Sequence, residues 1–141
     1  TGIAGLVLFN RFYSPDFDID KFEVISSNVF SKPSDLSISL RWIAIMAQRV
    51  SCDLAASTGV HDGVALIKQI LAGADAVQVV STLYQNGKGQ IGEMLETLEG
   101  WMEKKGFNSL SDFRGKMSQA KSSDPAAYER MQFMKHFSEI R

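Results

Sequence analysis

The sequence predicts an α/β fold with about three parallel strands that alternate with helices. Short apolar runs lie at residues 2–9, 53–57 and 76–80, and a helical pattern of apolar side chains fills the interval between the second and third runs. A further helical pattern follows the third run. Strands separated by a helix normally pair in parallel, because the helix returns the chain to the same end of the sheet.

Composition fits one folded domain, since 45% of the 141 residues are hydrophobic. The 15 Lys and Arg balance 16 Asp and Glu to a net charge of -1, without the basic block that nucleic acid binding requires. Cys52 is the only cysteine, which excludes an internal disulfide and suits a reducing compartment. No HExxH motif or paired carboxylates support a metal site. We therefore expect a cytoplasmic protein without nucleic acid, metal or membrane partners.

Residues 2–9 form a run that is apolar on both faces, which predicts a strand covered on each side. This run is too short to cross a bilayer, and no signal peptide precedes it. The chain starts directly on the run, which suggests a cut from a longer protein. A polar and aromatic stretch follows at residues 10–32, within which residues 22–30 are interpreted as a short hairpin or an excursion over the mouth of the fold.

A helix is predicted after this stretch. Ser34 or Asp35 can cap its start, and it should end near Val50. Its buried face should contain Leu40, Ile43, Ala44 and Ala47.

Residues 53–57 begin a complete strand, helix and strand unit. A tight turn is predicted at residues 58–60 and a helix start at residues 61–62, while Gly73 ends this helix and residues 76–80 form the next strand. The inward side chains of the helix should be Val64, Leu66, Ile67, Ile70 and Leu71.

A short helical turn is predicted at residues 81–87 and a long helix at residues 88–105. This order follows the last strand of many phosphate-binding barrels. The inward face of the long helix should contain Ile91, Met94, Leu95 and Leu98. The tail contains a segment at residues 110–117 and a final helix at residues 125–137, with Pro125 in its first turn. We expect Met131, Phe133, Met134 and Phe137 to pack on the exterior of the fold or on a neighbouring subunit.

The turns after the second and third predicted strands could form an anion cradle. Both turns lead into helix N-termini, whose N–H groups lack intrahelical partners, and Gly59 permits a close backbone approach. The hydroxyl groups of Ser57, Ser81 and Thr82 add further donors. The alternative is that Gly59 serves only a tight turn and the hydroxyl groups only cap helices, and both interpretations stay open at this point.

Polar residues near the strand ends are further candidates. Asn10 could hydrogen-bond a carbonyl or ring nitrogen of a ligand, or simply cap a turn. Arg11 could bind a ligand carboxylate or pair with Asp16 or Asp18. His61 could face a phosphate or serve as a solvated helix start.

Four segments together resemble the C-terminal half of the dihydroorotate dehydrogenases. They are residues 5–10 (GLVLFN), 57–60 (STGV), 70–79 (ILAGADAVQV) and 105–116 (KGFNSLSDFRGK). The third is shared by many flavin and phosphate barrels, whereas the fourth is much more specific. The resemblance covers residues 2–118.

The resemblance implies that residues 1–141 form the C-terminal half of an FMN-binding TIM (β/α)8 barrel domain. The FMN phosphate would lie between the turns that map onto Ser57, Thr58, Gly59, Val80, Ser81 and Thr82. Asn10 matches an asparagine that binds the pyrimidine substrate. The family is a group of flavoprotein oxidoreductases that convert dihydroorotate to orotate in pyrimidine biosynthesis and pass the electrons to fumarate, NAD or a quinone.

Three departures from the family pattern accompany this resemblance. Thr58 and Val80 stand where the family has glycine, and Arg11 stands where a small hydroxyl residue usually follows the asparagine. The catalytic base and active-site lysines of the family belong to its N-terminal half, so no catalytic residue is expected in this chain.

The expected substrate of the parent protein is therefore a dihydropyrimidine or a related cyclic molecule. A whole barrel needs about 250 residues, so we expect this chain alone to be inactive and to form a homo-oligomer or associate through its first strand. Two alternatives remain: another FMN or phosphate-binding barrel enzyme, or a half-barrel binding module without catalysis.

Overall fold

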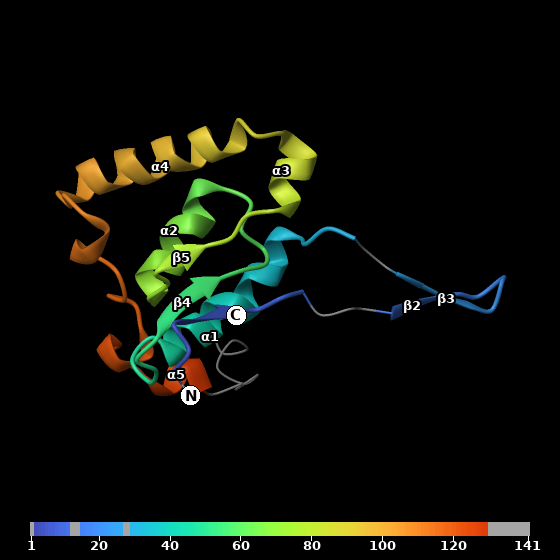
Figure 1. The fold of residues 1–141 in the computed structure, drawn as a ribbon, viewed down its shortest axis with the longest axis horizontal. Coiled ribbons are helices and arrows are strands. Elements are labelled where there is room, and N and C mark those ends of the chain that lie inside the picture. The colour runs from blue at the N-terminus through green and yellow to red at the C-terminus, as the bar shows by residue number, and fades with distance from the viewer. Residues whose placement is uncertain (1, 12–14, 27–28, 130–141) are drawn as a thin grey trace, which may run out of the picture.

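The computed structural model describes residues 2–11, 15–26 and 29–129 (Figure 1). The strands are β1 (Gly5–Leu8), β2 (Pro15–Asp18), β3 (Glu23–Ser26), β4 (Asp53–Ala56) and β5 (Ala76–Val77). The α-helices are α1 (Leu36–Met46), α2 (Gly63–Ala72), α3 (Ser81–Asn86), α4 (Gln90–Lys105) and α5 (Ala126–Glu129). Short 3-10 turns lie at Pro33–Asp35, Leu110–Asp112 and Gln119–Lys121.

A three-stranded parallel sheet organises the described chain, in the order β1-β4-β5. The predicted alternation of parallel strands and helices is therefore confirmed. The third strand is shorter than predicted, because the chain leaves the ladder after the N–H of Gln78 donates to the carbonyl of Ala56 at 2.8 Å and then turns toward α3. The carboxyl ends of all three strands open toward the same edge of the sheet.

Helices α1 and α2 cover one face of this sheet. Leu54 and Ala56 point to that face and are buried with Ile43 of α1 and Ala72 of α2. Val7 points to the other face and is 49% exposed, so the prediction that the first strand is covered on both sides is wrong for the described chain. A parallel sheet normally has both faces covered, and here the described residues cover only one.

A second apolar cluster joins α2, α4 and the segment after α4. Phe113 is fully buried, and its ring centroid lies 5.0 Å from that of Trp101 and 5.4 Å from that of Phe107. The family-specific segment at residues 105–116 therefore has a packing role, because its two phenylalanines close the end of the α2 and α4 pair.

Hydrogen bonds at Asp112 hold the turn between these phenylalanines. Its carboxylate accepts the N–H groups of Asn108 and Ser109, both at 2.8 Å. These two bonds are the main cause that keeps the pKa of Asp112 below its usual value.

The helix boundaries agree with the prediction at some ends and differ at others. Asp62 caps α2 by accepting the N–H of Ala65 at 2.7 Å, and Gly73 ends this helix at φ 122°. Helix α1 ends at Met46 rather than near Val50. Asp35 does not cap it through its side chain, which instead accepts the N–H of Lys32 at 2.9 Å and closes the preceding 3-10 turn.

Some predicted inward side chains are exposed. Val64 is 53% exposed because α2 turns Gly63 toward α4, where a Cβ would lie 2.4 Å from the Cβ of Thr97. On α4, Met94 and Leu98 are buried as predicted. The two predicted positions on α4 that differ are Ile91 and Leu95, with exposed fractions of 43% and 47%.

Strands β2 and β3 form an antiparallel hairpin that extends away from the rest of the molecule (Figure 1). A hairpin is present, but it pairs residues 15–18 with residues 23–26, so the predicted range of 22–30 contains only its second strand. The hairpin does not fold back over the body, whereas Val29, at the end of the range predicted as an excursion, lines the cavity at the carboxyl ends of the strands.

The described tail packs against α1. The carbonyl of Tyr128 accepts a hydrogen bond from Nε of Arg41 at 2.6 Å, and Glu129 pairs with Arg49 at 2.9 Å. Helix α5 starts directly after Pro125, as predicted. The rest of the predicted final helix lies outside the described residues, including Met131, Phe133, Met134 and Phe137. Among the described residues, no helix combines the length and apolar character that a bilayer crossing requires.

Candidate functional site

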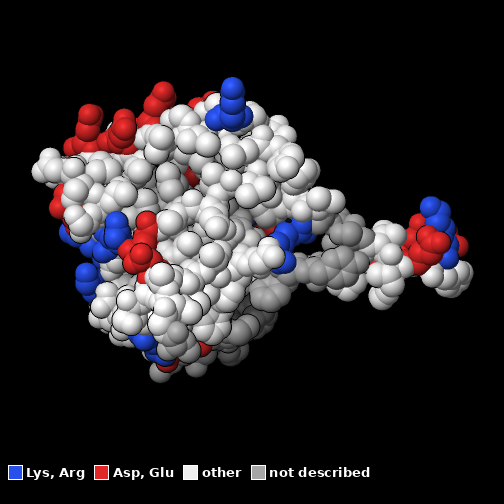
Figure 2. Space-filling view, in the orientation of Figure 1, with Lys and Arg blue, Asp and Glu red and all other residues white. Residues whose placement is uncertain are grey.

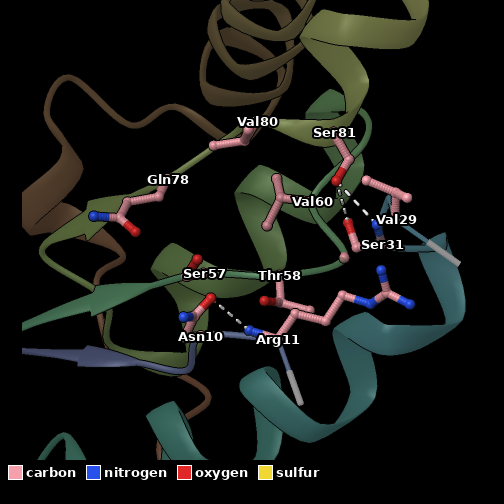
Figure 3. A pocket seen from close by; sticks show the side chains of 11 residues that line it. Asn10, Arg11, Val29, Ser31, Ser57, Thr58, Val60, Gln78, Val80 and Ser81 are labelled. Atoms are coloured by element: carbon pink, nitrogen blue, oxygen red, sulfur yellow. Dashed lines mark hydrogen bonds between the residues drawn. The ribbon is translucent and has the colours of Figure 1, made fainter. Parts of the chain in front are cut away.

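A cavity of about 210 Å³ lies at the carboxyl ends of the sheet strands. Its lining residues come from the ends of β1, β4 and β5 and from the segment before α1 (Figure 3). They are Asn10, Arg11, Val29, Ser31, Ser57, Thr58, Gly59, Val60, Gln78, Val80 and Ser81. The turn after β4 and the turn before α3, predicted to lie side by side, thus border one cavity.

The turn after β4 is fixed by bonds to the end of β1. The N–H of Ser57 donates to the carbonyl of Leu8 at 3.0 Å, and the hydroxyl of Thr58 donates to the carbonyl of Phe9 at 2.9 Å. Thr58 has a φ of 78° and Gly59 a φ of 80°. A threonine rarely adopts this left-handed conformation, and its hydroxyl bond to Phe9 helps to hold it there.

Gly59 is required by its contact with α1. A Cβ at this position would lie 2.2 Å from the backbone nitrogen of Leu36, so any side chain here would force the turn and α1 apart. The sequence suggested that the missing side chain makes room for an oxyanion. The structure corrects that reason: the absent Cβ would point at the start of α1, while the backbone of Gly59 borders the cavity.

Backbone donors from both turns border the cavity. Among the described residues, the N–H groups of Gly59, Val60 and Ser81 donate to no other residue. The branched side chain of Val80 lines the cavity and is 60% exposed. The site therefore combines unused N–H donors with an apolar side chain where the resemblance implies a glycine.

Thr82 lies outside the cavity lining, in contrast to the prediction. It is fully buried, and its hydroxyl donates to the carbonyl of His61 at 3.2 Å and accepts from Nδ2 of Asn86 at 2.9 Å. Because α3 starts at Ser81, successive side chains point about 100° apart around the helix axis, and Thr82 faces the protein interior. Five of the six predicted phosphate residues line the cavity and Thr82 does not.

Asn10 and Arg11 lie at the β1 side of the cavity (Figure 3). The side-chain oxygen of Asn10 accepts the N–H of Arg11 at 2.9 Å, which is the turn bond that the sequence left as one interpretation. Asp18 pairs with Lys21 at 3.7 Å. The Asn10 side chain nevertheless lines the cavity, so a ligand contact and a turn bond are compatible.

The prediction missed Ser31 and Gln78. Gln78 is the only polar residue in the run at residues 76–80, and a lone amide at the end of a parallel strand is a signal that could have found it. Ser31 gave no such signal, because 50 residues of chain separate it from Ser81, whose hydroxyl accepts its N–H at 2.9 Å.

The charge distribution favours an anion in this cavity over one at the α4 surface. Arg11 is the only charged side chain among the described lining residues. Acidic side chains instead gather over α4 (Figure 2), where Glu93, Glu96, Glu99 and Glu103 are exposed. Within the described ranges, no group of three or more His, Cys, Asp or Glu side chains could hold a metal ion.

Comparison with curated proteins finds dihydroorotate dehydrogenases. The catalytic subunit of dihydroorotate dehydrogenase B (NAD(+)) from Petrotoga mobilis is 31% identical over 117 residues, which are 81% of this chain and 39% of that protein. The corresponding subunit from Alkaliphilus metalliredigens is 29% identical over 82% of this chain and 39% of that protein. A probable dihydroorotate dehydrogenase A (fumarate) from Streptococcus pneumoniae is 41% identical over 59 residues, which are 42% of this chain and 19% of that protein. No family model matches the chain.

Solved structures show the same relationship at the level of the fold. The DHODH of Eimeria tenella in complex with ferulenol matches with a TM-score of 0.64 and 21% identity, over 81% of this chain and 31% of that one. A ligand-free type DHODH from the same organism matches with a TM-score of 0.56 and 23% identity, over 60% of this chain and 24% of that one. The chain spans 39% of the length of the first curated relatives. Over about 80% of its length, the chain is therefore a relative of the dihydroorotate dehydrogenases.

Proposed function

We propose that this chain is part of an FMN-dependent oxidoreductase resembling dihydroorotate dehydrogenase, and that it supplies the binding site for the flavin phosphate. One observation carries the proposal. The turns after β4 and before α3 border a single cavity, and both contribute N–H groups that donate to no other described residue. Such paired strand-end turns form phosphate sites in many barrels.

The open face of the sheet supports a larger barrel. Gly5, Val7 and Ala76 point away from α1 and α2 and are exposed, although the residues are small or apolar. A parallel sheet with one bare face is completed in a barrel by further strands around a packed interior. We infer that the chain contributes the C-terminal part of a TIM (β/α)8 barrel.

The size of the cavity suits a phosphate group rather than a whole flavin. Sites for drug-sized ligands usually have volumes of about 300–1,000 Å³, whereas this cavity has about 210 Å³. The residues that would hold the phosphate are Ser57, Thr58 and Gly59 on one turn and Val80 and Ser81 on the other. The rest of the cofactor would then lie outside this cavity.

The donor set of the cavity fits a phosphate chemically. Its described lining contains N–H groups, hydroxyl groups and the Arg11 guanidinium, and it contains no carboxylate that would repel an anion. A glycine at position 80 would let the backbone approach the phosphate, whereas Val80 carries a branched side chain there. We therefore expect this turn to hold the phosphate less closely than it would with a glycine. The flavin, when bound, supplies the redox chemistry that oxidises the substrate ring.

Asn10 and Arg11 would contact the substrate from the end of β1. The Asn10 amide suits a carbonyl or ring nitrogen, and the Arg11 guanidinium suits a carboxylate. This pair favours a dihydropyrimidine-like substrate with an acidic group. The chain contains no residue that we assign as the catalytic base, so we expect activity only from the complete protein.

Flavin retention tests the proposal. The complete protein that contains this chain is purified without added flavin, and its visible spectrum and released nucleotide are measured. We expect a flavin absorption band with FMN close to one per chain, and dihydroorotate should bleach the band under anaerobic conditions. A protein that neither retains nor binds added FMN would refute the phosphate site. Bound FMN without bleaching would refute only the substrate.

A further inference from the structure

Ser31 connects the segment before α1 to the cavity through Ser81. Its N–H donates to the Ser81 hydroxyl oxygen at 2.9 Å, and its own hydroxyl donates to the same oxygen at 3.0 Å (Figure 3). The Ser31 hydroxyl also lies 3.1 Å from Nε2 of His61. Ser31 is 9% exposed, so these bonds form in a largely dry environment.

These contacts determine where the hydroxyl protons lie. A serine hydroxyl has one proton to donate and two lone pairs to accept with. Because the Ser31 proton is directed toward Ser81, this arrangement requires the His61 tautomer that carries its proton at Nε2 and donates it to Ser31. The oxygen of Ser81 receives two donors from Ser31, and its own proton donates to no other described residue.

Ser81, whose hydroxyl proton has no acceptor among the described residues, lines the cavity in which we place the phosphate. We propose that Ser31 is a positioning residue for anion binding, and that with His61 it orients the Ser81 hydroxyl so that its proton donates to the bound anion. This inference rests on the proposed function. In a series of connected hydrogen bonds, each bond polarises the next. The Ser81 hydroxyl at the end of the series is therefore a stronger donor than an isolated hydroxyl.

Thr82 supports the His61 end of this series of hydrogen bonds. Its hydroxyl donates to the carbonyl of His61 at 3.2 Å, and Nε2 of Gln90 donates to the same carbonyl at 3.4 Å. Both bonds hold the backbone that presents the His61 ring. Thr82 therefore acts on the ligand only indirectly, through His61. This explains why its hydroxyl is buried next to the cavity without lining it.

The competing explanation is that Ser31 only attaches its segment to α3. The two explanations differ in ligand preference. A positioning role affects only ligands that carry the anion, whereas a purely structural role affects all flavins equally. The preference for FMN over riboflavin, which lacks the phosphate, is therefore the quantity to measure.

The experiment measures dissociation constants of FMN and riboflavin for the complete apoprotein by fluorescence quenching. We expect S31A to lower the preference for FMN about fivefold, the effect of a hydrogen bond worth about 1 kcal/mol, with riboflavin affinity unchanged. S81A should lower the preference at least as much. The double variant S31A/S81A should match S81A alone, because Ser31 acts through Ser81.

Two controls sharpen this test. Ser34 is an exposed serine of the same segment outside the lining, so S34A should keep the wild-type preference. S31T and S31V have nearly the same shape and differ by one hydroxyl group. S31T should keep the FMN preference and S31V should lose it, which gives a comparison independent of how well S31A folds.

Three outcomes would overturn the positioning role: additive effects of S31A and S81A, an equal loss of FMN and riboflavin affinity in S31A, or equal preferences for S31T and S31V. A wild-type protein that binds riboflavin as tightly as FMN would instead refute the phosphate site itself, and the positioning role with it. A wild-type preference for FMN that S31A leaves intact would refute only the positioning role.

Discussion

Replacing Gly59 with alanine tests whether the turn after β4 is held by its contact with α1. Two separate costs are expected. Alanine at a φ of 80° costs about 1–2 kcal/mol, because its Cβ approaches the neighbouring carbonyl oxygen. The new Cβ would also lie 2.2 Å from the nitrogen of Leu36, and forcing the two elements apart costs about 1–3 kcal/mol. G59A should therefore destabilise the fold by roughly 2–5 kcal/mol.

Gly87 provides the matched control. Its φ is 81°, almost the same as that of Gly59, and a Cβ there would meet nothing within 4 Å. Gly87 has φ 81° and ψ 172°, a conformation essentially confined to glycine, so G87A should cost only the conformational part, about 1–3 kcal/mol. The difference between the two variants isolates the contact with Leu36.

Urea denaturation followed by circular dichroism measures this difference. With a slope of about 1–3 kcal/mol per molar urea, the midpoint of G59A should fall below that of G87A by roughly 1 M, at an unchanged slope. Equal midpoints for the two variants would refute the close packing of Gly59 against α1. A lower slope would show that the substitution changes the compactness of the unfolded or folded state, and the comparison would then use the fitted free energies.

Three further predictions concern packing, pH and the cavity. F113A removes a fully buried ring and should cost about 3–5 kcal/mol in the same urea assay, and a cost below 1 kcal/mol would contradict the aromatic packing. Because hydrogen bonds from Asn108 and Ser109 lower the pKa of Asp112 in the folded state, the stabilisation is complete above the usual value of 3.8 and is lost as the pH falls through the lower folded value. Stability measured below pH 5 should therefore fall less steeply in D112N, and an unchanged acid dependence would argue against these bonds. V80G should raise FMN affinity roughly threefold to tenfold, about 1 kcal/mol, and a weaker affinity would show that the valine side chain contributes to binding.

Local features of the fold could be predicted because they depend on residues close in sequence. Asp62 and Gly73 mark the two ends of α2 through bonds within one turn of the helix. The apolar runs of β1 and β4 and the helix between β4 and β5 likewise follow from short-range patterns. The resemblance at residues 105–116 pointed to the family, and the structure shows that this segment has a packing role.

The side-chain orientations depended on contacts that no local pattern contains. Val64 has an apolar side chain at a plausible inward position, yet it is exposed because Gly63 takes the contact with α4. The exposure of one face of β1 could not be predicted for a similar reason. The same apolar pattern is compatible with a strand covered on both faces and with a strand that the described residues cover on one face only.

The sequence by itself determined the order of strands and helices, the strand ends at which the candidate site lies, and the family that the chain resembles. Only the tertiary structure decided which side chains meet there. It showed that Thr82 does not line the cavity and that Gly59 is needed for its contact with α1. It also placed Ser31 in the cavity lining beside Ser81, which is 50 residues away in the sequence. Secondary structure follows from neighbours within a few residues, whereas a cavity is formed by segments that meet only after the chain has folded.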